Sequence, residues 1–231
     1  MPPVPRTPLN IRADNPTAVA RAAEQLRERI LTGELPEGKR LSEVELAAEL
    51  AVSRQTVHLA LAQLQGTGLA ERREGGGLRV TVPDARYIAE VSTVALLLWK
   101  PALLETDFLA DPSTVDAVLA ALTQVRSMIA DGQPKDGAAF TSAFFDVFRP
   151  IVALTGNRVW LELHDLLATR GAIGVRGFTE AIDAAGISAW TAAIEKAVRA
   201  GDRRALYEVF ASLSALSTTF QEDVEGVAPS R

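Results

Sequence analysis

The chain has 231 residues, of which 24 are basic and 29 acidic, so its net charge is −5, and it contains no cysteine. The absence of cysteine excludes a disulfide framework, a zinc ribbon and a thiol nucleophile. The acidic total argues against a basic coat over the whole surface, although it is compatible with a local basic patch. With only two histidines, His58 and His164, the sequence also disfavours a histidine-based enzyme.

The start of the chain carries prolines at positions 2, 3, 5 and 8 and lacks the apolar run of a secretory signal. The most apolar run, Val94–Trp99, lies between Glu90 and Lys100. It falls well short of the roughly 20 apolar residues that a transmembrane helix needs, so we interpret it as part of a buried helix. We therefore expect a cytoplasmic protein that contacts no membrane, with residues 1–16 as a disordered tail.

Residues 17–83 are predicted to form three helices and a β-hairpin. Thr17 is expected to cap the first helix, which Gly33 ends. Ser42 begins a capping box for a short second helix, and Ser53 caps a third. Segments 69–73 and 78–82 predict a hairpin, and the three glycines between them provide the backbone freedom that its tip requires.

Two short helices separated by Ala51 and Val52, followed by a hairpin, are typical of a winged helix–turn–helix. In that fold the second helix enters the DNA major groove and its first turn meets the base edges. Arg54 is suited to guanine and Gln55 to adenine, while Ser53 and the helix N-terminus suit a phosphate. The candidate reading residues are therefore Ser53, Arg54, Gln55, Thr56 and, one turn on, His58.

Three arginines near the hairpin are candidates for phosphate contacts: Arg72 and Arg73 on the wing, and Arg40 before the second helix. Taken singly, each of these features also fits an ordinary solvated surface. The combination of helix spacing, caps and a glycine-tipped wing favours DNA binding over that simpler interpretation.

A spaced set of residues runs through this segment: Gly33, Leu35, Pro36, Gly38, Leu41, Glu43, Leu46 and Ala47, then Val52, Ser53, Arg54, Val57, Ala60, Leu61, Leu64, Gly68 and Leu69. This set resembles the GntR family of bacterial transcription regulators. The resemblance implies DNA contacts by Arg54 and by the wing glycine Gly77, both of which match. The family usually has arginine where His58 stands, and often a basic residue at Gly76. These departures imply fewer phosphate contacts and a shallow salt dependence of binding.

Val82-Pro83-Asp84 marks a domain boundary, because the first 84 residues are electrically neutral and the remainder carries the whole net charge of −5. From residue 84 apolar residues recur at helical spacing. Breaks are expected near Pro101, Pro112, residues 132–134, Gly156, residues 171–177, Gly186 and Gly201. Six or seven helices fit between these breaks, so we predict an all-helical bundle over residues 84–225 and a tail over 226–231. The fold class is thus mainly α, with a winged helix–turn–helix at residues 17–83.

Thr155-Gly156-Asn157 and the segment from Ala193 to Asp202 resemble the ligand-binding domain of the FadR subgroup of GntR regulators. Many members of that subgroup hold a divalent metal with one aspartate and three histidines. The resemblance places those ligands at Phe144, Phe148, Thr191 and near Leu213, none of which ligates a metal strongly. We therefore expect no metal and no cofactor. His164 lies beside Glu162 and Asp165, a spacing that does not put two ligands on one helix face, so it is interpreted as a single exposed histidine.

Two hypotheses remain open for this region. In the first, an apolar pocket binds an acyl-type or other apolar effector through Phe144, Phe148, Trp190, Thr191 and Leu213, and Arg149, Arg158, Arg170 and Arg176 are candidates for an anionic head group. In the second, the aromatic residues fill the cavity that holds the metal site in other members of the subgroup. The protein is then regulated by a protein partner or by its own concentration.

A helical enzyme is a remote third reading, because no paired carboxylates, nucleophile–base pair, phosphate loop or metal cluster supports it. The sequence instead predicts a DNA-binding repressor or activator. Because two recognition helices must lie one helical turn of DNA apart, we expect a homodimer on a palindromic operator in double-stranded DNA.

Overall fold

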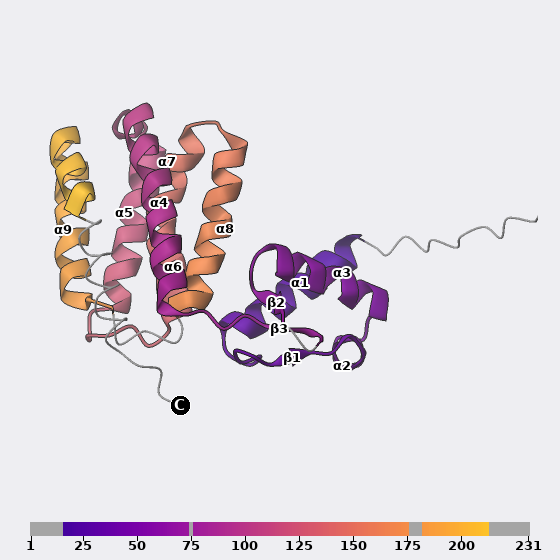
Figure 1. Cartoon of the computed structure of the whole chain (residues 1–231). Coiled ribbons are helices and arrows are strands. Elements are labelled where there is room, and N and C mark those ends of the chain that lie inside the picture. Colours follow the sequence, from indigo (N-terminus) through magenta and orange to yellow (C-terminus); the bar gives the residue numbers. More distant parts are fainter. Residues whose placement is uncertain (1–15, 74–75, 176–181, 213–231) are drawn as a thin grey trace, which may run out of the picture. The chain divides into compact units, whose positions relative to one another are not determined.

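The computed structural model describes residues 16–73, 76–175 and 182–212. The chain divides into two compact units, Met1–Val80 and Thr81–Arg231 (Figure 1). The tail expected at residues 1–16 lies outside the described residues except for Pro16, which begins a helix. Leu213, Arg176 and the tail expected at 226–231 also lie outside them.

The N-terminal unit is built on three helices, α1 (Pro16–Leu31), α2 (Glu43–Glu49) and α3 (Arg54–Gly66). Leu26 and Ile30 of α1 are fully buried, as is Val57 of α3, and the two helices pack against each other. The first helix begins two residues earlier than a cap at Thr17 predicts, so Thr17 lies inside its first turn rather than at its cap. The physical reason is that Pro16 has the fixed φ that suits the first helical position.

A tight turn joins α2 to α3. The Ser42 side chain accepts a hydrogen bond from the Glu45 N–H at 3.4 Å, which confirms the predicted cap. Ala51 has a φ of +52°, in the left-handed region that residues with a Cβ seldom adopt. The Val52 N–H then donates to the Ala47 carbonyl at 3.1 Å. This single left-handed residue reverses the chain between the two helices.

The hairpin consists of β2 (Ala70–Arg72) and β3 (Leu78–Val80), which confirms the predicted wing. A strand that sequence reasoning missed, β1 (Arg40–Leu41), pairs antiparallel with β3, so the sheet order is β1-β3-β2. At two residues, β1 is too short for an alternating pattern to reveal it. Each strand of the hairpin is also shorter than expected.

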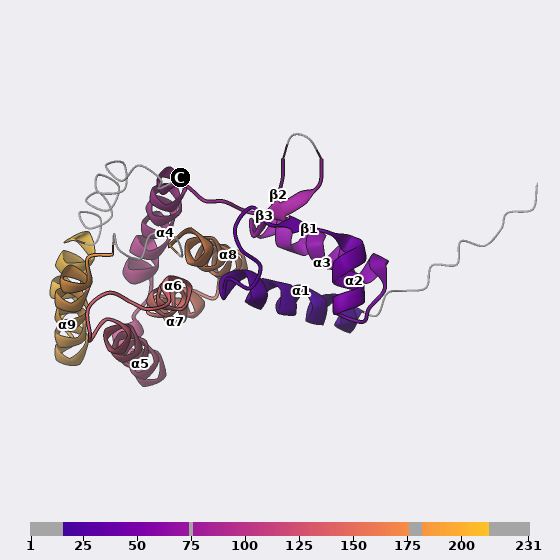
Figure 2. The same ribbon diagram turned by 90° about the horizontal axis from the view of Figure 1, so that it is seen from below.

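The C-terminal unit is all-helical, as predicted. Its elements are α4 (Ala85–Glu105), the short 3₁₀ helix η1 (Phe108–Ala110), α5 (Pro112–Met128), α6 (Gly137–Asp146), α7 (Arg149–Leu154), α8 (Arg158–Val175), α9 (Ala184–Ala200), and a last helical stretch at residues 203–212. Figure 2 looks along this bundle and shows α6 and α7 between α5 and α8, with α4 at one edge. Asp84, Asp111 and Asp183 cap α4, α5 and α9.

The predicted break at Pro101 is wrong, because α4 runs through it. α8 runs through Gly171 and ends at Val175, within the predicted break at residues 171–177, and α9 begins at Ala184, two residues before Gly186. Trp99 and Ala102 on either side of Pro101 are buried against the bundle, and this packing outweighs the one backbone hydrogen bond that proline removes. The glycines of α8 serve close packing instead. A Cβ on Gly171 would lie 3.1 Å from Thr141 Cγ2, and one on Gly174 would lie 2.9 Å from Ile88 Cγ1.

Two segments, Arg86–Glu105 and Gly137–Leu154, have the length and composition of membrane-crossing helices. In this structure 33% of the first and 56% of the second is buried within the protein. Because the core helices of soluble proteins meet the same criteria, the two segments are weak evidence for a membrane.

Replacing Gly174 with alanine is expected to destabilise the C-terminal unit by about 1–3 kcal/mol, because the new methyl group overlaps Ile88 in a packed core. Gly66→Ala, in α3, is the control, since no atom lies within 4 Å of its added methyl group. That change is expected to leave stability unchanged or raise it by up to about 1 kcal/mol. Urea unfolding of both variants measures the difference, and equal stabilities would contradict the close approach.

Candidate nucleic-acid interface and aromatic cluster

The start of α3 presents its polar side chains outward. Ser53 is extended (φ −69°, ψ 151°), and its Oγ accepts a hydrogen bond from the Thr56 N–H at 2.9 Å. Val57, Ala60 and Leu61 face the core, which turns Arg54 and Gln55 to the solvent. The predicted cap is thus confirmed, and the two predicted base-reading side chains lie together at an exposed helix N-terminus.

Thr56 differs from its neighbours because its side chain is buried, at 4% exposure. Its Oγ1 lies 2.7 Å from Ser53 Oγ, so the two hydroxyl groups support each other at the helix start. In this position Thr56 fixes the first turn from the inside. A direct contact between Thr56 and DNA stays a prediction.

His58 lies exposed one turn further along α3, and its Nδ1 is 2.8 Å from Oε1 of Glu43 in α2. Sequence reasoning missed this partner, because 15 residues separate the two in the chain and only the turn at Ala51 brings them together. The pair ties the two helices of the motif to each other. It also places a carboxylate beside the predicted reading residues, which lowers the positive potential there.

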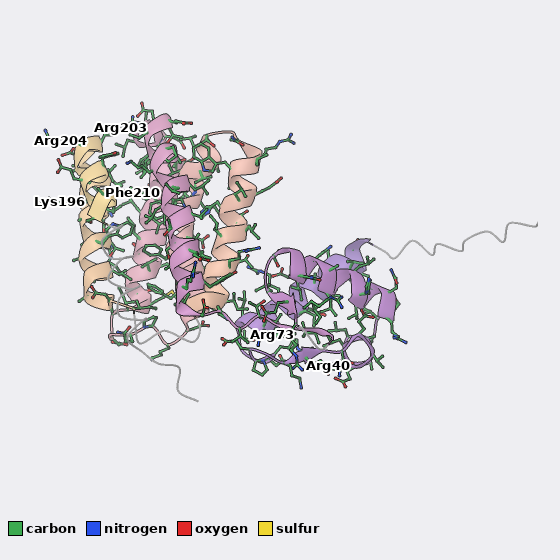
Figure 3. All side chains as sticks on the ribbon, viewed as in Figure 1. Arg40, Arg73, Lys196, Arg203, Arg204 and Phe210 are labelled. Atoms are coloured by element: carbon green, nitrogen blue, oxygen red, sulfur yellow. The ribbon has the colours of Figure 1, made fainter. Side chains whose placement is uncertain are left out.

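The wing region gathers most of the remaining predicted residues. Arg72 is exposed at the end of β2, while Arg73 Nε lies 2.7 Å from Glu71 Oε1. Gly77 has a φ of +102°, and a Cβ there would lie 3.4 Å from Arg40 Nε, so Arg40 and Gly77 are neighbours across the sheet. Figure 3 shows Arg40 and Arg73 on this unit.

Arg79 of β3 is a basic residue of the sheet that sequence reasoning did not single out. It lies opposite Arg40 in the register of β1 and β3, and its Nη1 donates to the Gly38 carbonyl at 3.0 Å. This hydrogen bond stabilises the turn before β1, so Arg79 has a structural role. Its place in the middle strand between two other arginine-bearing strands adds positive charge to the wing.

The sequence model described as "Bacterial regulatory proteins, gntR family" matches residues 18–80, which is the segment that forms this unit. The N-terminal unit is a GntR-family winged helix–turn–helix domain.

Two relatives carry names of transcriptional regulators. The chain is 37% identical over 109 residues to Mce2R of Mycobacterium tuberculosis, a match that covers 47% of this chain and 44% of Mce2R. It is 30% identical over 173 residues to the transcriptional repressor NanR of Edwardsiella tarda, covering 65% of each chain. The chain thus spans less than half of the length of Mce2R and 65% of that of NanR.

A solved structure of a GntR regulator from Rhodococcus sp. RHA1 has the same fold. The two structures superpose with a TM-score of 0.70 at 24% identity, covering 92% of this chain and 99% of the other. At this identity the likeness concerns the fold alone. It covers the helical C-terminal unit as well as the N-terminal unit.

The C-terminal unit carries a cluster of aromatic side chains. Phe148 stacks on Trp99 with ring centroids 4.0 Å apart, and its centroid lies 6.0 Å from that of Trp190. The centroids of Phe144 and Trp190 are 5.4 Å apart. Three of the predicted effector residues are therefore in mutual contact. The full set, called the aromatic cluster below, is Trp99, Phe140, Phe144, Phe145, Phe148, Trp190 and Phe210.

Thr191, the fourth described effector candidate, is fully buried. Its Oγ1 donates to the Ser188 carbonyl at 2.9 Å, so the hydroxyl group is used within its own helix. Over the described ranges 16–73, 76–175 and 182–212, no three histidine, aspartate or glutamate side chains gather as metal ligands would.

Trp99, Phe210 and His164 are members of this region that sequence reasoning missed. The prediction of an exposed His164 is wrong, since only 1% of it is exposed. The signal lay in the inward stripe of α8, where His164 and Gly171, seven residues apart, share a face. His164 lies 5.6 Å from Phe145 between ring centroids, and neither of its ring nitrogens has a hydrogen-bond partner. The indole nitrogen of Trp99 is likewise buried without one.

Burial lowers the pKa of His164 from 6.5 to about 4, because the charged imidazolium loses its solvation. The nearby Asp165 opposes this shift, and Arg149 adds to it. Arg149 itself donates two hydrogen bonds to Asp165, from Nε at 2.9 Å and from Nη2 at 3.1 Å. Its guanidinium is thus committed to a carboxylate, which argues against Arg149 as the head-group partner.

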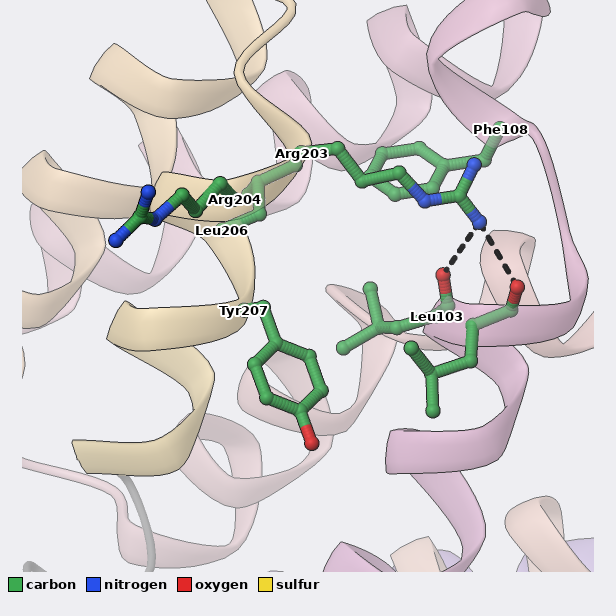
Figure 4. Close-up of a pocket in the computed structure, with 7 residues that line it drawn as sticks. Leu103, Phe108, Arg203, Arg204, Leu206 and Tyr207 are labelled. Atoms are coloured by element: carbon green, nitrogen blue, oxygen red, sulfur yellow. Dashed lines mark hydrogen bonds between the residues drawn. The ribbon is translucent and has the colours of Figure 1, made fainter.

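A separate pocket of about 290 Å³ lies between the end of α4 and the last helical stretch (Figure 4). Nη2 of Arg203 reaches across to the end of α4 and donates to the carbonyls of Leu103, Leu104 and Thr106 at 3.2, 2.9 and 2.8 Å. It therefore caps α4 instead of offering its donors to a ligand. The lining contains none of the four described effector candidates, Phe144, Phe148, Trp190 and Thr191. It consists of Leu103, Leu104, Phe108, Arg203, Arg204, Leu206 and Tyr207.

Lowering the pH is expected to reduce the free energy of unfolding through the protonation of His164. Its pKa is lower in the folded state than in the unfolded state, so the unfolded chain binds the proton first. The contribution of neutral His164 to the free energy of unfolding is fully present above pH 6.5. It falls by as much as about 3 kcal/mol as the pH drops toward 4. Urea unfolding between pH 7.5 and 4 measures the loss. The His164→Phe variant should lose less over the same range, and an equal loss in both proteins would contradict the assignment.

Proposed function

We propose that the chain is a cytoplasmic transcriptional regulator of the FadR type, which binds a palindromic operator as a homodimer and catalyses no reaction. One observation carries the proposal: within a GntR-family domain, Arg54 and Gln55 stand exposed on the first turn of a helix whose start is fixed by Ser53. Regulators of this kind insert that turn into the major groove.

Each residue of the interface has a chemical task in this proposal. Arg54 bonds a guanine through its two guanidinium donors, and Gln55 bonds an adenine. Ser53 and the amide groups of the helix start hold a backbone phosphate. Arg40, Arg72 and Arg73 contact phosphates from the sheet, while Gly77 permits the wing to approach the sugar–phosphate backbone closely. His58 contributes a weaker contact, since Glu43 shares it.

The operator is found by selecting binding sites from a random duplex library with the full chain. On the selected site, Arg54→Ala and Gln55→Ala are each expected to cost about 1–3 kcal/mol and to relax the preference at one base position in each half-site. Gln65→Ala is the matched control, because Gln65 is an exposed glutamine at the other end of the same helix. Fluorescence anisotropy measures the affinities. If Gln55→Ala and Gln65→Ala behaved alike, α3 would not be the reading helix.

We further propose that the C-terminal unit senses an apolar, acyl-type small molecule at the aromatic cluster, without a metal. Two features support this proposal. The cluster, which includes Phe144, Phe148 and Trp190, is an apolar environment, and the unpartnered ring nitrogens of Trp99 and His164 can bond a polar group. A ligand that binds one arrangement of the DNA-binding domains better than another would then change operator affinity.

One observation favours the alternative of a regulator without an effector. The rings of Trp99 and Phe148 are stacked at 4.0 Å, and those of Trp99 and Phe145 meet edge-on at 4.9 Å, so side chains occupy the centre of the cluster. In this alternative the unit serves dimerisation or binds a protein partner. A bound effector must displace part of this packing.

Titration with fatty acids and acyl-CoAs separates these two candidates. Two of the three tryptophans, Trp99 and Trp190, belong to the cluster, so an effector is expected to change tryptophan fluorescence and operator affinity at the same concentrations. The Phe148→Ala variant should shift both responses together. A flat response to every ligand would favour the regulator without an effector and leave the DNA-binding proposal intact.

A further inference from the structure

The outer face of α4 carries apolar side chains that the described part of the chain leaves half or more exposed. Val94, Leu97 and Leu104 are 50%, 69% and 53% exposed. They lie on the side opposite the buried residues Ala95 and Trp99, at spacings that keep them on one helix face. Figure 2 shows α4 at an edge of the bundle.

Charged side chains flank this apolar centre at both ends of the same face. Arg86 and Glu90 lie toward the N-terminus of α4, and Lys100 and Glu105 lie toward its C-terminus, all exposed. Arg86 Nε is 2.9 Å from Glu90 Oε1 within the helix, and Lys100 Nζ lies 5.7 Å from the centre of the Tyr207 ring. Both contacts are at the surface, where such pairs contribute little and can be exchanged for others.

Two copies of α4 related by a two-fold axis would place acidic residues of one copy opposite basic residues of the other. If two copies of α4 cross antiparallel with the axis between Ala95 and Leu96, Val94 of one copy meets Leu97 of the other. At a rise of 1.5 Å per residue, Glu90 and Lys100 lie roughly 7–8 Å from the axis on opposite sides, so each faces its opposite in the partner. Arg86 and Glu105 lie about 14 Å away and meet in the same way.

We propose that the outer face of α4 is the surface on which a second copy of this chain docks, antiparallel, with Val94 and Leu97 at the centre and two Glu90–Lys100 pairs around them. The inference rests on the homodimer of the proposed function and specifies its interface. A two-fold contact repeats every interaction, so each favourable charge pair counts twice. A partner with a different sequence would gain nothing from this symmetry.

Charge reversal in the full-length chain tests the arrangement. Glu90→Lys opposes Lys100 of the partner with a lysine, and Lys100→Glu opposes Glu90 with a glutamate. Each variant alone is expected to raise the dimer dissociation constant by roughly tenfold or more in sedimentation equilibrium. A mixture of the two variants has two attractive contacts and should form heterodimers, which a tag on one variant detects. The double variant E90K/K100E should dimerise like the original chain.

Glu24→Lys, in α1, is the control for the change in net charge, since Glu24 is exposed and pairs with an arginine on its own helix as Glu90 does. Circular dichroism checks that every variant folds. Single variants that stay dimeric, or a mixture that stays monomeric, overturn the α4 interface while a dimeric regulator stands. An original chain that is monomeric and binds a half-site alone overturns both the interface and the dimer of the proposed function.

Discussion

In the C-terminal unit the indole of Trp99 stacks on Phe148 and contacts Phe144, Phe145 and His164. One side chain of α4 thus joins α6, α8 and the residue that caps α7. Because Trp99 fixes the rotation of α4 about its axis, it also determines which residues of that helix face outward. The position of Trp99 thus determines both the packing around His164 and the exposure of the stripe of α4 that includes Leu97. The stacked rings further decide how much of the interior is left for a small molecule.

The N-terminal unit depends on a different balance. Its hydrophobic core turns Arg54 and Gln55 outward, but Glu43 and Glu71 lie beside two of the basic side chains near them. A domain with partly neutralised charge has weak attraction for any DNA backbone, whatever its sequence. In the proposed operator complex, discrimination among sites would then rest mainly on the contacts to bases, because little of the binding energy would be shared by all sequences.

Much of this architecture follows from local chemistry that a sequence displays directly. The Ser42 and Ser53 caps, the inward stripe of α3 and the glycine-tipped hairpin each depend on residues close together in the chain, and the structure has them. The helical nature of the C-terminal unit is equally local. The errors concern tertiary contacts: Pro101 stays helical because Trp99 and Ala102 are buried, and His164 is enclosed because α8 places it among aromatic rings. The two-residue β1 and the Glu43–His58 pair also depend on distant partners.

The guanidinium of Arg203 links the local unfolding of the last helical stretch to that of the end of α4. It holds three carbonyl groups at the end of α4 from the first residue of the last helical stretch, so that stretch cannot leave α4 without exposing all three at once. Separate fraying of either element is therefore costly, and the two form one cooperative unit. In hydrogen exchange, the amide protons of residues 203–212 and of the final turn of α4 would gain and lose protection together.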